Sequence, residues 1–152
     1  MFTPFVTFVA SVLIWILFIG LGVLWLIDGR IKKEQVVHAL IAVFIAWLTT
    51  FLIKDFFPRN RPFVNDNMRP ITLTIPKDPS FPSTHTAVAF ALATTIYLHD
   101  KKVGRIFLVE ALLVAVARVL ADVHYPIDVT VGAFLGVFIA WSLSKIHVFN
   151  RS

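Results

Sequence analysis

The chain has 152 residues, of which 58% are hydrophobic and only 15% charged, a more apolar balance than that of soluble domains. It contains no cysteine, which excludes disulfides and thiolate chemistry. The net charge of +5 does not predict a nucleic-acid partner, because cations that flank long apolar runs are membrane topology signals.

Apolar runs recur along the chain, and the first is long enough to cross a bilayer. It covers residues 5–27 without a charge, which suffices for a tilted span. Shorter runs follow at about 36–53, 83–98, 106–121 and 127–146. The sequence therefore predicts an all-α integral membrane helical bundle of about five transmembrane helices, forming a single membrane-integrated domain over residues 1–152.

A long polar segment, residues 54–82, separates the second run from the third. It holds most of the chain's eight prolines, which break helices, so it is predicted to be an irregular loop. Loops of this length are uncommon in small domains and often have a binding or lid role. We therefore expect the loop 54–82 to contribute to a site.

Basic residues gather in two short turns, residues 28–34 and 99–105, and at the C-terminal end, which adds Lys145 and Arg151. With five spans these segments lie on one side of the membrane, which the positive-inside rule makes cytoplasmic. This side has only slightly more basic residues than the other. The difference widens if some of the basic residues on the other side serve to bind an anion. The sequence thus predicts a multi-pass plasma-membrane protein whose site, in loops 54–82 and 122–126, faces the extracytoplasmic side at the membrane–water interface.

One stretch, residues 118–128, brings a cation, an imidazole and a carboxylate into one loop. Pro126 suits the first turn of a helix, so His124 and Asp128 fall on one face as that helix begins. The carboxylate can hold one ring nitrogen of His124 and leave the other basic. Arg118 can fold back and offer a phosphate its planar fork of donors. Taken alone, the same residues also suit an interfacial His and Asp beside a snorkelling arginine.

Two further polar clusters, residues 54–62 and 81–85, are predicted on the same side as residues 118–128. Pro82 or Ser83 stands where a helix begins, and unpaired N–H groups beside a hydroxyl make an anion site. Lys54 and Arg61, together with Arg118, can neutralise such an anion. The three clusters are therefore expected to meet, although they lie far apart in the sequence.

The two histidines of these clusters, His85 and His124, suit phosphoryl transfer. An oriented imidazole can act as nucleophile while a second acts as acid, and the cations take the charge of the transferring group. A metal site of two His and one Asp is the rival interpretation. It is less favoured because a positive pocket repels a divalent cation, so we expect neither a metal nor another cofactor.

These residues resemble the signature of the type 2 phosphatidate phosphatase superfamily of lipid phosphatases, which is related to vanadium haloperoxidases. That signature consists of Lys, six residues, Arg-Pro; then Pro-Ser-x-His; then Ser-Arg, five residues, His, three residues, Asp. The corresponding residues here are Lys54 and Arg61-Pro62, then Pro82-Ser83-Thr84-His85, then Arg118, His124 and Asp128. All three parts occur in order with the expected spacing, within about residues 50–140.

The resemblance implies a role for each matched residue. It makes His124 the nucleophile that forms a phosphohistidine, Asp128 the residue that orients it, and His85 the acid for the leaving oxygen. Phosphate binding falls to Lys54, Arg61, Ser83, Thr84 and Arg118, with main-chain N–H groups of residues 83–85, and without a metal.

The chain departs from the family pattern at two positions of the signature. Thr84 replaces the usual Gly, so the backbone there lacks glycine's freedom, and Ala117 replaces the Ser before Arg118. The family commonly has six spans, whereas five are counted here. These departures leave the catalytic residues in place.

A phosphate-handling site in a membrane predicts a lipid phosphate as substrate and the bilayer as partner. Residues 61–64 and 78–83 resemble bacterial undecaprenyl-diphosphatases of this superfamily. Phosphatidylglycerophosphate, phosphatidate and lipid A phosphate stay open as substrates, and so does an inactive packing or transport protein of the same fold. Gly132 and Gly136 form a GxxxG pattern, so an oligomer stays open, although close packing inside the bundle is favoured.

Overall fold

The computed structural model describes residues 3–27 and 30–145, without the side chains of residues 30–32. Within this part, the regular elements are α1 (Thr3–Ser11), α2 (Leu13–Ile27), α3 (Arg30–Phe56), α4 (Pro62–Asn65), α5 (Thr84–His99), α6 (Lys101–Leu120) and α7 (Pro126–Lys145). All of them are helices, which confirms the predicted all-α class for the described residues. The end of the predicted last span, Ile146, and the tail with Arg151 lie outside them.

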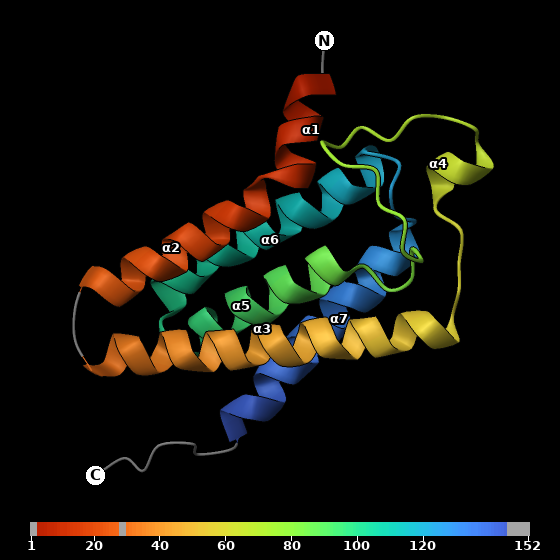
Figure 1. Ribbon diagram of the computed structural model, residues 1–152. Helices are drawn as coiled ribbons and strands as arrows, with labels where there is room; N and C mark the ends of the chain where they lie inside the picture. The colour runs from red at the N-terminus through yellow and green to blue at the C-terminus, as the bar shows by residue number, and fades with distance from the viewer. Residues whose placement is uncertain (1–2, 28–29, 146–152) are drawn as a thin grey trace.

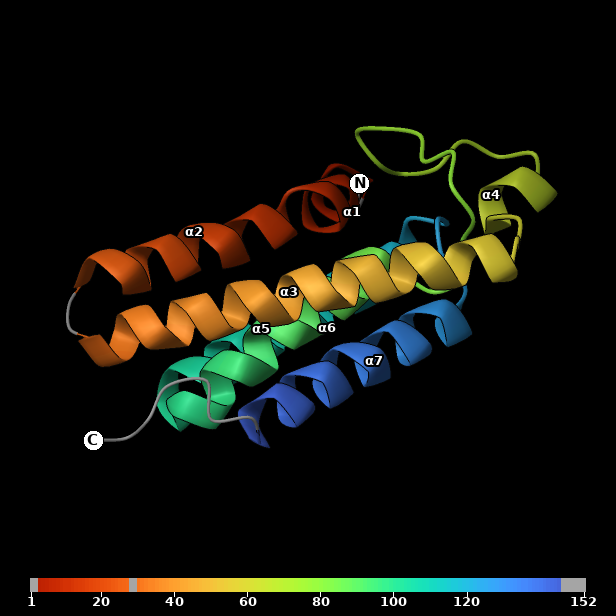
Figure 2. The same cartoon turned by 60° about the horizontal axis from the view of Figure 1, so that its bottom comes forward.

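The long helices lie side by side, with α5 packed against α3, α6 and α7 (Figures 1 and 2). The C-terminal ends of α3 and α6 and the N-terminal ends of α5 and α7 meet at the end of the bundle that carries α4 and the long loop (Figure 1). The fold therefore brings the three polar clusters of the sequence to one end of the bundle.

Two glycines of α7 let this helix approach α5 closely. A Cβ atom on Gly132 would lie 2.6 Å from the Ser83 carbonyl oxygen, and one on Gly136 would lie 2.3 Å from that of Ala87. Only glycine allows such contact between backbones. The GxxxG pattern is thus confirmed as packing inside the bundle, and it holds the start of α5 against α7.

Two helical segments of the described residues are long and apolar enough to cross a membrane alone: Lys33–Phe56 of α3, and α7. The helices α1 and α2 count as a third only if they are taken together. The helix α5 has 16 residues, and α6 carries Arg105, Glu110 and Arg118 along its length. By length and composition, the described helices therefore supply two spans, or three with α1 and α2 taken together.

The first predicted span, residues 5–27, is not one straight helix. It is bent by 47° between α1 and α2. At the break, Arg118 Nη1 donates to the Ala10 carbonyl oxygen at 2.8 Å. A side chain that enters the helical hydrogen-bond ladder is a common cause of a kink. The bend therefore has its origin in the polar end of the bundle.

The turn between α5 and α6 is shorter than the predicted basic turn, residues 99–105. The helix α6 already begins at Lys101, because the Asp100 carboxylate accepts from the N–H groups of Lys102 and Val103, at 2.9 and 3.1 Å. In the same way, the predicted irregular loop 54–82 contains the last turn of α3 and the short helix α4. Both corrections leave the basic residues at the ends of the bundle where the sequence placed them.

Candidate active site

The turn between α6 and α7 places His124. The N–H groups of Val123 and His124 both donate to the Arg118 carbonyl oxygen, each at 3.3 Å. Asp122 takes a φ of 61°, a left-handed conformation that aspartate tolerates better than most residues. Pro126 begins α7, as the sequence predicted. This tight turn fixes the imidazole next to the end of α6.

The ring of His124 is buried, and its hydrogen-bonding partners identify its tautomer. Arg61 Nη1 lies 3.2 Å from His124 Nε2, and a guanidinium can only donate, so Nε2 is the unprotonated nitrogen that accepts from Arg61, and Nδ1 carries the hydrogen. His124 Nδ1 lies 3.6 Å from Asp128 Oδ2, which is close but longer than a hydrogen bond. His124 thus has its unprotonated nitrogen on the side of the cations.

The surroundings of His124 favour the neutral ring. Burial, together with the charges of Arg118, Arg61 and Lys54, lowers the pKa of His124 to about 4, although the neighbouring Asp128 raises it. A histidine with a lowered pKa is neutral above that pKa and charged only below it. The imidazole is therefore neutral, and able to act as a nucleophile, at pH 7.

Lys54 and Arg61 are held together by a carboxylate that sequence analysis did not assign to the site. Asp78 Oδ2 lies 2.9 Å from Lys54 Nζ, and Asp78 Oδ1 lies 2.9 Å from Arg61 Nη2. Burial raises the pKa of Asp78, but the bond from Lys54 and the charges of Arg61 and Lys54 outweigh it and lower that pKa below its usual value. Both cations are buried, whereas the Asp78 side chain is 54% exposed. Asp78 therefore holds the place beside both cations that an anionic ligand would take.

Arg118 is the cation with donors to spare. Its side chain is buried and its Nη1 is bonded to Ala10, but its Nε has no partner among the described residues. It lines the same cavity as His85 and His124. An anion in the cavity would therefore meet an unsatisfied guanidinium.

The start of α5 differs from expectation in one detail. Ser83 is fully buried, its Oγ lies 3.0 Å from Thr86 Oγ1, and its N–H donates to the Asp128 carbonyl oxygen at 3.0 Å. Thr84 and His85 line the cavity instead, and the first N–H groups of a helix have no intrahelical acceptor. Ser83, which the sequence predicted as a phosphate ligand, therefore does not line the cavity, whereas Thr84 and His85 do.

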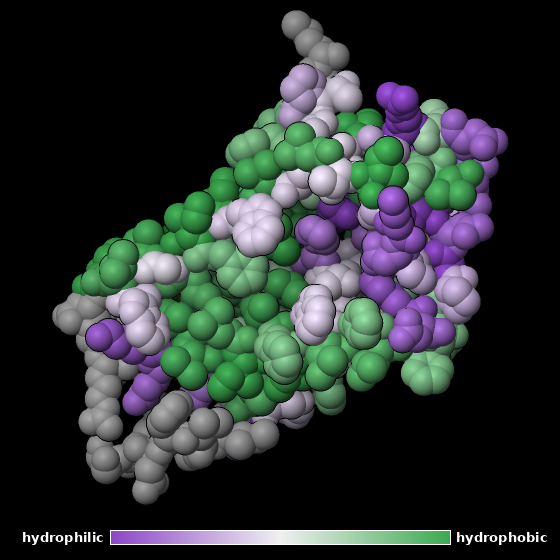
Figure 3. All heavy atoms as spheres, in the orientation of Figure 1, coloured by the Kyte–Doolittle hydropathy of each residue, from purple (hydrophilic) through white to green (hydrophobic). Residues whose placement is uncertain are grey.

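These side chains enclose one end of a cavity of about 570 Å³. The polar end is lined by Lys54, Arg61, Asp78, Thr84, His85, Arg118 and His124. Asp55 of α3 also lines the cavity, and the other walls are mostly apolar, with Ile14, Trp15 and Phe18 from α2 and Val43, Trp47 and Phe51 from α3. Polar residues cover the loop end of the molecule while apolar ones cover its helices (Figure 3). The cavity suits a ligand with an anionic head and an apolar tail.

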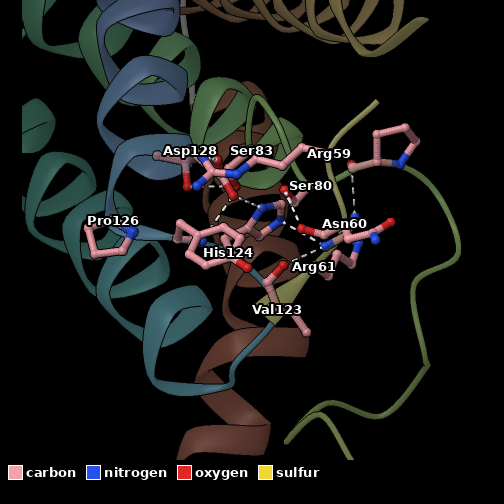
Figure 4. A network of polar contacts seen from close by, with 12 residues as sticks. Arg59, Asn60, Arg61, Ser80, Ser83, Val123, His124, Pro126 and Asp128 are labelled. Atoms are coloured by element: carbon pink, nitrogen blue, oxygen red, sulfur yellow. Dashed lines mark hydrogen bonds and ion pairs between the residues drawn. The ribbon is translucent and has the colours of Figure 1, made fainter. Parts of the chain in front are cut away.

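Asp128 lies behind His124, with no exposed surface, and does not line the cavity. Arg59, which was not among the predicted site residues, reaches its Oδ1 atom (Figure 4). Arg59 and Asp78 are the two site residues that the signature does not include. The only signal for either was its place, beside Arg61-Pro62 or at the start of segment 78–83.

An apolar helical bundle in which buried cations and two histidines meet at the end of a cavity defines a membrane phosphatase. The family model described as the PAP2 superfamily matches residues 35–152. The chain therefore belongs to the PAP2 superfamily, a family of phosphatases, as its signature indicated. The matched region contains every predicted site residue, from Lys54 to Asp128.

Curated relatives extend this similarity over most of the chain. It is 34% identical to the bacitracin transport permease protein BcrC of Bacillus licheniformis, over 99% of this chain and 76% of that protein. It is 31% identical to the undecaprenyl-diphosphatase of Sulfolobus acidocaldarius, over 88% of this chain and 64% of that protein. The undecaprenyl-diphosphatase BcrC of Bacillus subtilis is 26% identical over 78% of this chain and 61% of its own length.

Two solved structures share the fold. LpxE of Aquifex aeolicus superposes with a TM-score of 0.75 and 29% identity, covering 95% of this chain and 84% of that one. The PAP2 type phosphatidylglycerolphosphate phosphatase of Bacillus subtilis superposes with a TM-score of 0.65 and 25% identity, covering 97% and 78%. Both are similar to this chain along nearly its whole length.

Proposed function

We propose that this chain hydrolyses undecaprenyl diphosphate through a phosphohistidine on His124, without a metal or another cofactor. The observation that carries the proposal is the position of His124 Nε2, an unprotonated nitrogen at the point where buried cations meet an apolar channel. The part of the cavity that is lined by α2 and α3 offers an apolar surface for a long isoprenoid chain. The names of the relatives from S. acidocaldarius and B. subtilis support this substrate.

The proposed reaction has two steps. In the first, His124 Nε2 attacks the terminal phosphorus, the bond from phosphorus to the bridging oxygen breaks, and His85, which enters this step as the imidazolium, gives that oxygen a proton and becomes neutral. Asp128 faces the Nδ1–H of His124 and stabilises the charge that the ring gains. In the second step water attacks the same phosphorus, His85 takes a proton from the water, and the bond from phosphorus to nitrogen breaks.

Charge stabilisation in both steps is assigned to Lys54, Arg61, Thr84 and Arg118, with the first N–H groups of α5. Phosphoryl transfer depends mainly on positioning and on fixed positive charge, which these groups supply. Among the described residues, no group of three or more His, Cys, Asp or Glu side chains could hold a metal ion. This donor set favours the proposal over the rival metal site.

Phosphate release from a panel of lipids by the purified protein tests the proposal. The panel contains undecaprenyl diphosphate, undecaprenyl phosphate, phosphatidylglycerophosphate, phosphatidate and a lipid A phosphate, each assayed with and without EDTA. We expect undecaprenyl diphosphate to be cleaved fastest and EDTA to have no effect. Preference for phosphatidylglycerophosphate would support the activity named for the B. subtilis neighbour. No release from any lipid would support the packing or transport alternative.

The pKa of His124 sets the acid limit of the reaction. Because that pKa is lowered to about 4, the nucleophile stays neutral as the pH falls from 8 to about 5 and is lost only below. We expect kcat/KM for an activated phosphate ester, corrected for ionisation of the ester, to stay level over that range. A decline centred near pH 6.5, the ordinary value for histidine, would contradict the neutral buried ring.

Asp78 must leave Lys54 and Arg61 when phosphate binds between them. Vanadate mimics the transferring phosphoryl group, and removing a competing internal carboxylate raises the fraction of competent sites. Asp78→Asn should therefore lower the inhibition constant for vanadate, by about tenfold or more. The exposed Asp66 on the same loop provides the matched control, Asp66→Asn. Weaker inhibition of Asp78→Asn would mean that Asp78 instead holds the two cations in place.

The proposed topology has five spans, with α1 and α2 together forming the first and α3, α5, α6 and α7 the others. It places the site on the extracytoplasmic face of the plasma membrane and the start of α6 on the cytoplasmic face. The chain has no cysteine, so single cysteines at the exposed Lys77 and Lys101 can be labelled separately. An impermeant reagent should label Lys77→Cys, but not Lys101→Cys, on intact cells. The reverse pattern would refute the topology.

A further inference from the structure

Asp128 is held at both carboxylate oxygens, and one of them, Oδ2, is also the oxygen that faces His124. Arg59 Nη1 lies 3.2 Å from Asp128 Oδ1, and the Tyr125 N–H donates to Oδ2 at 2.9 Å (Figure 4). The carboxylate is fully buried, whereas the Arg59 side chain is 43% exposed. The arginine therefore reaches inward from the surface to a carboxylate that solvent does not reach.

Arg59 is itself fixed at both ends. Its guanidinium carbon lies 4.0 Å from the centre of the Tyr125 ring, within the range of a cation–π contact. The Tyr125 hydroxyl accepts from Asn65 Nδ2 at 2.8 Å, which holds the ring. The Arg59 carbonyl oxygen accepts from the Ser80 N–H at 2.9 Å, which ties its backbone to the other end of the long loop. A side chain held in this way has little freedom to leave its partner.

The position of Arg59 distinguishes it from the cations assigned to phosphate. Lys54, Arg61 and Arg118 line the cavity, and Arg59 does not. A guanidinium on the outer oxygen keeps a carboxylate ionised and fixes its orientation. Asp128 needs both properties if it is to hold the Nδ1–H of His124, since a mis-set carboxylate leaves the ring in the wrong orientation.

We propose that Arg59 is a positioning residue, which holds Asp128 in the orientation that aligns His124 for attack. The inference rests on the proposed role of His124 as nucleophile. It assigns a role in the reaction to a residue that does not line the cavity. It also gives a function to the contacts of Arg59, in the segment after α3, with Tyr125 and Asp128 at the start of α7.

The test compares Arg59→Gln with wild type on the lipid and on a nitrophenyl phosphate. We expect kcat to fall by about 10–100-fold on both substrates, a loss typical of residues that orient a reacting group through a second one. KM and the inhibition constant for vanadate should not change, because Arg59 does not touch the phosphate. Arg59→Lys should recover part of kcat, since it keeps the charge but not the planar fork.

A double-mutant cycle separates positioning from a general structural role. If Arg59 acts through Asp128, the variant Arg59→Gln/Asp128→Asn should be no slower than Asp128→Asn alone. The exposed Arg69 on the same loop gives the control, Arg69→Gln, which should match wild type. Thermal unfolding of each variant checks folding, and Arg59→Lys replaces Arg59→Gln in the cycle if the latter does not fold.

Three results would overturn the inference. The first is an unchanged kcat in Arg59→Gln. The second is weaker inhibition of Arg59→Gln by vanadate, which would make Arg59 a phosphate ligand. The third is a double variant whose loss of kcat equals the product of the losses in the two single variants. Failure of the proposed function looks different, because wild type would then release no phosphate from the lipid, or Asp128→Asn alone would keep full activity.

Discussion

Replacing His124 with alanine is expected to stop phosphoryl-enzyme formation completely, whatever the leaving group. Among the described residues that line the cavity, His124 is the imidazole with a carboxylate within 4 Å of its ring, and its unprotonated Nε2 accepts from a cation. Single-turnover phosphate release and phosphoryl transfer to the protein, each measured on lipid and on nitrophenyl phosphate, provide the readout. Asp128→Asn should retain partial activity on both substrates, because the ring stays but is poorly oriented.

The variant His85→Ala should fail in a different way. His85 lines the cavity and is assigned only the proton of the leaving oxygen. General acid catalysis typically contributes about 10²–10⁴-fold, so activity on the lipid should fall by that order. A nitrophenolate leaves without a proton, so activity on the activated ester should fall much less. If instead His124→Ala kept activity on the activated ester while His85→Ala lost it, the two roles would be exchanged.

Replacing Arg118 with alanine should slow the reaction by about 10²–10³-fold, the usual loss when one fixed donor to the transition state is removed. Arg118 is the buried cation of the cavity whose Nε has no protein partner among the described residues, so its free donor is available to the phosphoryl group. Arg118→Lys should restore little, since a lysine cannot offer two parallel donors. Measured on lipid and activated ester alike, the loss should be similar.

The bond from Arg118 to Ala10 requires a control, because the substitution also removes a contact to α1. Thermal unfolding of Arg118→Ala reports that structural loss separately from the rate. Arg105→Ala, at the exposed far end of the same helix, should leave both properties unchanged. An Arg118→Ala enzyme with wild-type rate and lower thermal stability would assign the residue to the fold alone.

The sequence predicted which side chains meet, because the decisive signals are local. The four-residue spacing of His124 and Asp128, and Pro126 at the helix start between them, depend only on helix geometry. The GxxxG pattern of Gly132 and Gly136 likewise favoured packing inside the bundle, and the structure shows it in the contact between α7 and α5. These features required no knowledge of distant parts of the chain.

The sequence could not predict how the long loop folds over these residues. Asp78 reaches Lys54 across 24 positions and Arg59 reaches Asp128 across 69, and neither distance follows from a periodic pattern. The inward turn of Ser83 onto Thr86 depends on the close approach of α7 to the start of α5. The bend at Val12 depends on an arginine more than a hundred positions away. The features that the sequence did not predict therefore depend on contacts between segments that lie far apart in the chain.

The phosphohistidine on His124 can be observed directly. The purified protein is mixed in EDTA with undecaprenyl diphosphate that carries a radiolabel in its terminal phosphate, and the reaction is stopped in alkali, where phosphohistidine survives. The account predicts label on the peptide that contains His124, formed and lost at rates consistent with turnover, and absent from His124→Ala. Label on another residue, or label that appears only when a divalent ion is added back, would contradict it.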